Sequence, residues 1–368
     1  MSAWAEKLRE LLRGVFRRQA GGAEGSGEAY KPGETGHAAE SRSSAASERV
    51  LSPFWVMVQK EFGDHVRSWR FIILLAIITL ACIGSIYAAV TALREGVSLL
   101  GGDADTEYLF LSMFTVSNGT LPNFLTFLSF LAPLIGVALG FDAVNSERNK
   151  GTLSRVLSQP VYRDDFLNAK FVAGLLLIAV VIFSLGFLVM GMGLLTIGYP
   201  PTPEEFFRIL LVLFITTVYV GLWLNLSIFF SVRFRQAATS ALAGIAVWIF
   251  FLVFYDMIVN LIGTALAPVN AVSIQQVQSY ANLIMFLTRI SPAELFQEAA
   301  STLLFPDVRT LNPFVTQDQA YLAISAPLSF GQSTLLVWPH IVALIAETAL
   351  VFAASYVLFM RQEIRSRH

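Results

Sequence analysis

Six apolar runs, each long enough to cross a lipid bilayer, dominate this 368-residue sequence. A helix that rises about 1.5 Å per residue needs about 20 apolar residues to span a hydrocarbon core of about 30 Å. The runs lie at residues 71–93, 121–141, 171–197, 207–232, 238–263 and 338–360. Membrane-spanning β-strands are about half as long and alternate apolar with polar residues, whereas these runs are continuous. The sequence therefore predicts an all-α polytopic membrane protein with six transmembrane helices.

The rest of the composition agrees with this class and offers little for catalysis. Charged residues make up 14% of the chain, against about 25% in a typical soluble domain. The single cysteine excludes an intrachain disulfide and a multi-thiolate metal site, and the four histidines have no metal-ligand spacing. No Gly-Lys pair occurs, so the chain cannot form a P-loop. We expect a non-catalytic membrane subunit without a cofactor, a metal or a nucleic-acid partner.

The lysine and arginine residues lie mostly on one side of the predicted spans. Of the 25, 21 precede the first run, lie in residues 142–170, directly follow the fourth run or belong to the C-terminal tail. Cytoplasmic loops carry an excess of these residues. We therefore expect both termini and residues 142–170 in the cytoplasm, residues 272–336 outside, and a multi-pass location in the plasma or inner membrane.

The first 70 residues divide into three segments. Residues 1–18 have one apolar and one basic helical face, which predicts an amphipathic surface helix on anionic lipid or a solvated helix without a role. Residues 19–52 are rich in Gly, Ala, Ser and Glu and predict a disordered linker. Residues 53–70 begin with a proline and carry Trp55 and Trp69 on an apolar stripe. This pattern predicts an interfacial helix that leads into the first span.

Residues 145–170 are a hydrophilic stretch between the second and third spans. It contains ERNKGTL from Glu147 and LSQPV from Leu157, with Arg163 and Lys170 before the third span. These motifs and their spacing resemble the permeases of the ABC-2 family. The resemblance covers about residues 53–360 and includes ISPAELF, which begins at Ile290. Within the family, the sequence looks like the branch associated with nitrous-oxide reductase and multicopper-enzyme maturation.

The resemblance implies a fold, partners and a set of contact residues. The fold is a six-span ABC-2 permease domain over 71–363, of the type V exporter-like kind. The partners are a cytoplasmic P-loop ATPase subunit, a second permease copy as a homodimer, and membrane lipid. The residues that touch the ATPase are Glu147, Arg148, Lys150, Gly151, Thr152, Leu153, Arg155, Leu157, Ser158, Pro160 and Arg163.

The residue pattern of this stretch is compatible with such a contact. A short helix from about Lys150 to Gln159, ended by Pro160, would present Arg155 to the ATPase and act as a rigid lever. Gly151 would allow a tight turn or a close backbone approach. Alternatively, the stretch is a solvated loop that only obeys the positive-inside rule.

Polar residues inside the spans mark a second candidate site. Glu347 lies about 13 Å along the sixth span, where an ionised group is costly unless it is paired or hydrated. It either lines a translocation path with Asn225, lies in a dimer interface, or stays protonated against Asn225 or a backbone group. Asp256 and Asn260 lie near the outer end of the fifth span, which favours an interfacial position.

The long segment at 264–337 predicts two short helices, about 275–289 and 292–304. Ser291, Pro292 and Glu294 have the pattern of an N-cap, a first-turn proline and a capping-box acid. The two helices either re-enter the outer leaflet or form a cap above it.

We interpret the chain as the permease subunit of an ATP-driven transporter, an exporter by resemblance to its family. One alternative is an ion-coupled secondary carrier that uses Glu347 and Asp256 as proton relays and needs no partner. Another is a membrane scaffold that recruits proteins through its amphipathic N-terminal segment.

Overall fold

The computed structural model describes residues 52–99, 108–119, 121–153, 162–198, 200–267, 274–306 and 328–361. Every regular element in these ranges is a helix. Six helical segments are long and apolar enough to cross a membrane: Trp69–Leu93, Phe124–Asn149, Arg163–Ile197, Pro203–Arg233, Ala237–Leu266 and Phe330–Arg361. The predicted all-α polytopic fold is thereby confirmed. The surface helix predicted at 1–18 and the linker at 19–52, except Ser52, lie outside the described residues.

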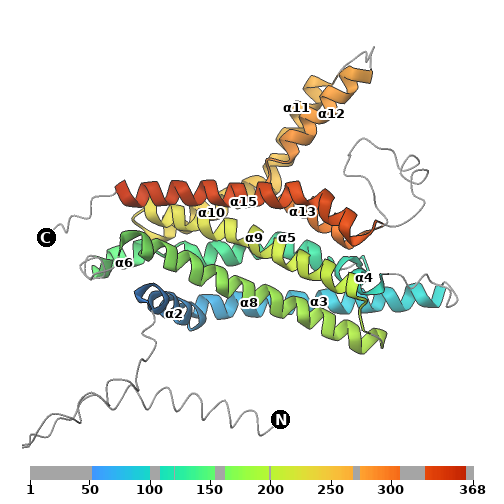
Figure 1. The fold of residues 1–368 in the computed structure, drawn as a ribbon, viewed down its shortest axis with the longest axis horizontal. Helices are drawn as coiled ribbons and strands as arrows, with labels where there is room; N and C mark the ends of the chain where they lie inside the picture. Colours follow the sequence, from blue (N-terminus) through green and yellow to red (C-terminus); the bar gives the residue numbers. More distant parts are fainter. Residues whose placement is uncertain are drawn as a thin grey trace, which may run out of the picture. The chain divides into compact units, whose positions relative to one another are not determined.

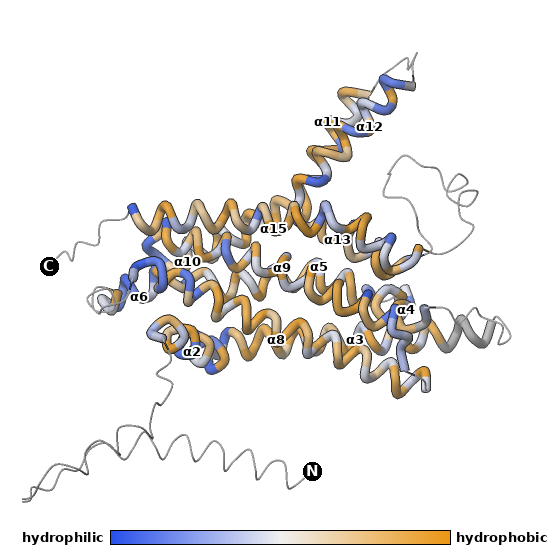
Figure 2. The backbone as a smooth tube through the Cα atoms, viewed as in Figure 1, coloured by the Kyte–Doolittle hydropathy of each residue, from blue (hydrophilic) through white to orange (hydrophobic). Residues whose placement is uncertain are grey.

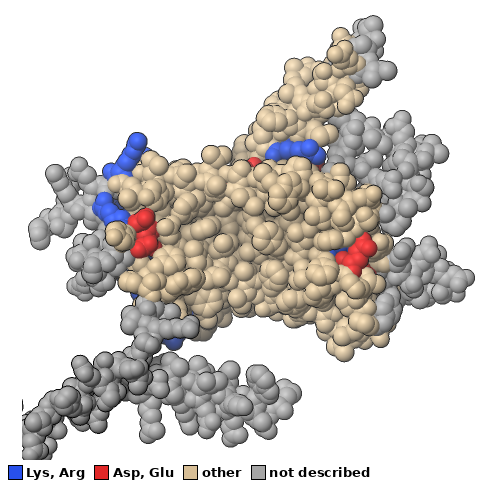
Figure 3. Space-filling view, viewed as in Figure 1, with Lys and Arg blue, Asp and Glu red and all other residues tan. Residues whose placement is uncertain are grey.

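Five long helices form the main bundle (Figure 1). They are α3 (Trp69–Leu99), α5 (Phe124–Gly140), α8 (Arg163–Ile197), α9 (Pro203–Arg233) and α15 (Phe330–Arg361). Helix α9 is central, because it packs against α5, α8 and α15 and is the most buried span. Hydrophilic residues lie mainly near the two ends of the bundle (Figure 2), and the visible flank between them is almost uncharged (Figure 3). This distribution suits a bundle surrounded by lipid.

Glycines allow α5 and α9 to pack with their backbones close together. A Cβ atom on Gly136 would lie 2.6 Å from the backbone nitrogen of Leu224, and one on Gly140 would lie 2.6 Å from the carbonyl oxygen of the same residue. Neither distance is compatible with a side chain. The two glycines are four residues apart and therefore share one face of α5, which is the small-residue pattern used at membrane helix contacts.

A buried arginine ties the start of α9 to the last two helices. Arg208 is fully buried, and it donates hydrogen bonds to the carbonyl oxygens of Leu303 and Leu328 and to the hydroxyl of Ser333. Its charge is paired with Glu204 at 2.8 Å. A complete set of partners is what makes a buried guanidinium tolerable. One end of α9 is thus fixed to α13 (Pro292–Leu304) and α15.

The fifth span is interrupted by a π-helix and continues into a hairpin. It consists of α10 (Ala237–Ile249), the π-helix η1 (Phe250–Phe254) and α11 (Tyr255–Leu266), and α12 (Ile274–Thr288) packs antiparallel to α11. The Tyr280 hydroxyl donates to the carbonyl of Gly263 at 2.8 Å, and the Tyr255 hydroxyl donates to that of Leu287 at 2.6 Å. These bonds join α11 and α12 at both ends of their contact.

Helix α13 has Ser291 at its N-cap position and Pro292 in its first turn, as predicted, but the predicted capping hydrogen bonds do not form. The Ser291 side chain forms no capping bond, and its hydroxyl has no partner among the described residues. The chain enters α13 through a tight turn in which the Ser291 amide donates to Thr288, and this turn leaves the hydroxyl buried. The capping box occurs instead at the start of α9, between Thr202 and Glu205.

Two short helices and one amphipathic helix complete the described fold. They are α2 (Pro53–Val66), α4 (Leu109–Thr115) and α6 (Asn145–Asn149). Helix α2 packs on α8, with Val58 against Ala169 and Ala173. The helix predicted over 53–70 ends at Val66, and Trp55 on α2 and Trp69 at the start of α3 are both exposed, as expected for residues at a lipid interface.

Candidate functional site

The described part of the predicted coupling stretch is a short helix followed by a tight turn. Glu147 and Arg148 lie on α6, and Arg163 is the first residue of α8. Lys150 and Gly151 form the turn, with Gly151 in the left-handed region at φ 69°, and Thr152 and Leu153 are helical. The helix predicted from about Lys150 is therefore preceded by a turn, with Thr152 as its first helical residue. Residues 154–161, with Arg155, Leu157, Ser158 and Pro160, lie outside the described residues.

A buried lysine joins the two ends of this stretch. The Lys170 ammonium on α8 lies 2.8 Å from a carboxylate oxygen of Glu147 on α6 and 2.8 Å from one of Glu61 on α2. The Lys170 side chain is 4% exposed, and each glutamate side chain is 13% exposed. It also lies over the Phe166 ring, 4.9 Å from the centroid. One buried cation therefore links the helices that precede and follow the stretch to α2.

The charge of Glu61 depends on this arrangement. Burial alone would raise the pKa of its carboxyl group, but the charge and hydrogen bond of Lys170, together with Lys60, lower it below the ordinary value. Burial lowers the pKa of the neighbouring His65 and favours its neutral form. Near neutral pH, Glu61 is therefore ionised and available to Lys170.

The base of the stretch is also bound to α9. The Ser231 hydroxyl accepts hydrogen bonds from the backbone amides of Val144 and Asn145, at 2.9 and 3.2 Å. The Asn149 side chain donates to the carbonyl of Arg235, between α9 and α10, at 3.0 Å. Displacement of α6 would therefore act on α2, α8 and α9 together.

A cavity of about 630 Å³ lies beside the lysine. Its charged lining is balanced: Lys60, Arg70, Lys150 and Lys170 face Glu61, Asp64, Asp142 and Glu147. Most of these charges already have partners, including an ion pair between Arg70 and Asp142. Such a lining has no strong preference for anions or cations.

Sequence reasoning did not identify the partners of Lys170. Glu147 lies 23 residues away along the chain and Glu61 lies 109 residues away. Lys170 is visible in the sequence as a basic residue before a span, but nothing local shows that it is buried. The nearest signal in the sequence was the acid Glu147 in ERNKGTL, which lies on the same predicted cytoplasmic stretch as Lys170.

The second predicted site is partly assembled. Asn225 on α9 is fully buried and donates to the Thr348 carbonyl on α15 at 2.8 Å, next to Glu347. The Asn225 carbonyl oxygen and one Glu347 carboxylate oxygen are buried and have no hydrogen-bond partner among the described residues. A direct Asn225–Glu347 hydrogen bond, one of the alternatives considered, is absent from this described region. The proposed path through these residues stays a prediction.

Asp256 and Asn260 lie on α11 and are both exposed. Within the described residues, no group of three His, Cys, Asp or Glu side chains is arranged to hold a metal ion. The candidate site around Lys170 therefore consists of ion pairs and hydrogen bonds that connect α6 to α2, α8 and α9.

Comparison with known proteins agrees with this architecture. A family model described as ABC-2 family transporter protein matches residues 55–364. A protein from Stutzerimonas stutzeri named "Probable ABC transporter permease protein NosY" is 27% identical over 210 residues, which cover 56% of this chain and 70% of the relative. A Pseudomonas aeruginosa protein of the same name is 26% identical over 249 residues, covering 66% of this chain and 79% of the relative. The family match extends from α2 through the end of α15, and on this basis the chain belongs to the ABC-2 family of transporter proteins.

Proposed function

We propose that this chain is the permease subunit of an ABC transporter and that a separate cytoplasmic ATPase docks on residues 147–163. The observation that carries the proposal is the Lys170 ion-pair cluster, defined as Lys170, Glu61 and Glu147. The cluster connects α2, α6 and α8 next to residues 147–163. A displacement of these residues by the ATPase would therefore move the three helices together. A solvated loop without a partner needs no such buried connection.

The expected test of docking is a charge reversal at Arg155. In co-expression with the cognate ATPase, Arg155→Glu should weaken association by about 1–3 kcal/mol, because a partly desolvated polar contact is lost. The measurement is the amount of ATPase that co-purifies with the tagged permease, alongside ATP-driven transport in vesicles. Arg361→Glu, at the exposed end of α15, is the matched control. Wild-type ATPase recovery with Arg155→Glu would exclude this docking site.

Our proposed topology places α6 in the cytoplasm and the segment between α13 and α15 outside the cell. In a Cys82→Ala background, a Thr316→Cys variant should react with a membrane-impermeant thiol reagent in intact cells. A Ser158→Cys variant should react only after the cells are permeabilised. The reverse labelling pattern would show that the orientation is inverted. Residues 147–163 would then lie outside the cell, where a cytoplasmic ATPase cannot bind them.

A second copy of the chain completes the assembly that we propose. Asp256 and Asn260 are four residues apart on α11 and are exposed within a spanning segment, where lipid offers no hydrogen bonds. A second permease would cover these groups or form a hydrated path between the copies. Export is the proposed direction, and Glu347 with Asn225 is the proposed path. An ion-coupled carrier would instead keep its transport activity without any ATPase.

A further inference from the structure

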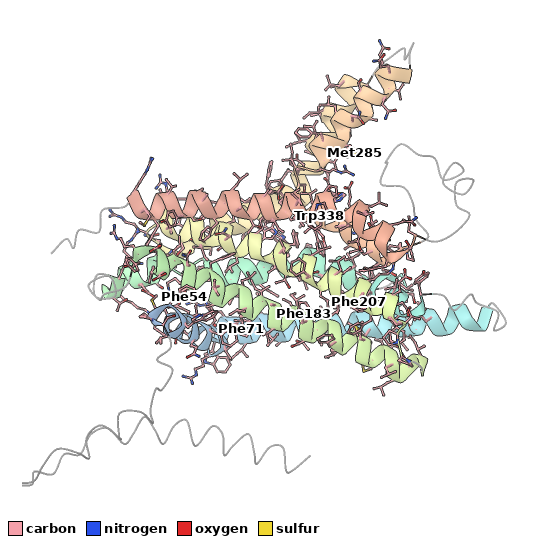
Figure 4. The ribbon with its side chains drawn as sticks, in the orientation of Figure 1. Phe54, Phe71, Phe183, Phe207, Met285 and Trp338 are labelled. Atoms are coloured by element: carbon pink, nitrogen blue, oxygen red, sulfur yellow. The ribbon has the colours of Figure 1, made fainter. Side chains whose placement is uncertain are left out.

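A small pocket lies between the turn after α12, helix α13 and helix α15, away from the Lys170 cluster. It has a volume of about 220 Å³. Figure 4 labels two residues that flank its lining residues in sequence, Met285 on α12 and Trp338 on α15. Its walls are mostly apolar and consist of Phe286, Ile290, Leu295, Pro339 and Ala343, with Arg289 and His340 as the polar members. Phe286 and Ile290 are exposed, so the pocket opens on the surface of the protein.

One carboxylate organises both polar residues. An oxygen of Glu298 lies 2.9 Å from Nε of Arg289 and 2.7 Å from Nε2 of His340. Burial would raise the pKa of the Glu298 carboxyl group, but the hydrogen bonds from His340 and Arg289 lower it. Glu298 is therefore ionised and can only accept, so the proton on His340 lies on Nε2.

This arrangement leaves polar groups without a partner. The His340 side chain is 3% exposed, and its Nδ1 atom has no hydrogen-bond partner in the described part of the chain. The Arg289 side chain is 30% exposed, and it uses Nε for Glu298, which leaves its two terminal nitrogens to bind another oxygen. A buried polar atom without a partner is unfavourable unless a ligand or water completes it.

The depth of the pocket suggests which ligand can reach it. His340 lies seven residues beyond Ser333, whose hydroxyl binds Arg208 at the start of α9. His340 is also the third residue of the apolar run 338–360, and the neighbouring Trp338 is exposed, as is typical of a residue at the boundary between lipid head groups and hydrocarbon. An anionic group and an apolar chain are both available there.

We propose that this pocket binds the anionic head group of a membrane amphiphile. The Arg289 guanidinium would pair with the anionic oxygen, Nδ1 of His340 would accept a hydrogen bond from a head-group hydroxyl such as those of phosphatidylglycerol, and the apolar walls would contact the first carbons of the chain. Sites that enclose a whole ligand have volumes of about 300–1,000 Å³. This pocket is smaller, so the remaining chain must stay in the bilayer. The proposal is independent of ATPase docking.

The test uses the full chain purified in detergent and native mass spectrometry with two lipids of identical acyl chains. We expect phosphatidylglycerol to be retained over phosphatidylcholine, with one tightly held molecule per chain. Arg289→Gln should reduce this retention about tenfold, the effect of losing a charge-assisted hydrogen-bonding partner in a partly buried site. Arg361→Gln makes the same charge change on the opposite end of the bundle and should leave retention unchanged.

A second variant tests the pocket without touching its charges. Ala343→Trp fills the apolar wall and should abolish selective retention while the ion pairs remain. Equal retention of both lipids by the wild-type chain would overturn the proposal, as would retention unaffected by Arg289→Gln in a folded protein. If inorganic phosphate alone displaced phosphatidylglycerol at equal concentration, the site would be one for free anions, and the amphiphile would be excluded.

Discussion

A Gly136→Ala/Gly140→Ala double variant is expected to lose at least about 2 kcal/mol of stability, because overpacking costs about 1–3 kcal/mol at a single tight site. Each new Cβ would lie 2.6 Å from backbone atoms of α9, and a backbone cannot rotate out of the way as a side chain can. The two helices would have to separate along their whole contact. Thermal unfolding of the detergent-purified protein, followed by size-exclusion elution, measures the loss.

The matched control is a Gly63→Ala/Gly191→Ala double variant. These glycines lie in α2 and α8, and a Cβ on either would meet nothing within 4 Å. The control should be neutral or stabilised by a few tenths to about 1 kcal/mol per site, since alanine restricts the unfolded chain. If both double variants unfolded at the same temperature, the close α5–α9 contact would be incorrect.

The second large effect is expected from Lys170→Met. It would leave the Glu61 and Glu147 carboxylates, each 13% exposed, without the cation between them. Removing one member of a buried ion pair costs about 3–5 kcal/mol. Lys60→Met serves as the control, because Lys60 also contacts Glu61 at 3.1 Å but its side chain is 60% exposed. An exposed pair contributes about 0–1 kcal/mol, so equal losses in the two variants would contradict the burial of Lys170.

A triple variant separates folding from coupling. Glu61→Gln/Glu147→Gln/Lys170→Met removes the charges together and should regain most of the stability, as neutral replacements of buried ion pairs often do. Under the proposed function, this variant transports more slowly, because the rigid link between α2, α6 and α8 is gone, and ATPase co-purification measures separately whether Glu147→Gln also weakens docking. Transport at the wild-type rate would show that the cluster serves folding alone.

The spans were predictable because each one is a continuous apolar run, a signal that needs no knowledge of its neighbours. The helices nonetheless extend beyond those runs: α8 begins at Arg163, whereas the third run begins at Phe171. Helical hydrogen bonds continue into the polar residues at the ends of a span. Hydropathy marks only the apolar part and therefore underestimates the length of the helix. The predicted helices at 275–289 and 292–304 had clear turn signals between them at Ile290–Pro292.

The features that depend on distant partners could not be predicted. Arg208 is the second residue of the apolar run 207–232, and its partners Leu303, Leu328 and Ser333 come from elsewhere in the chain. The capping box was assigned to Ser291 when the equivalent pattern at Thr202 was the one that formed. Both positions have a suitable residue at N-cap and an acid three residues later, so only the path of the preceding chain distinguishes them.

The two tyrosine bonds between α11 and α12 have a mechanical consequence. Tyr280 and Tyr255 brace the hairpin near its tip and near its base, so its two helices cannot slide past each other without breaking both bonds. Any swing of this arm must instead be absorbed where it is jointed, at the π-helix Phe250–Phe254 and at the turn carrying Arg289. The second joint is a wall of the small pocket. A molecule bound in the pocket would restrict movement at this turn. The angle between the α11–α12 hairpin and the bundle would then depend on whether the pocket is occupied.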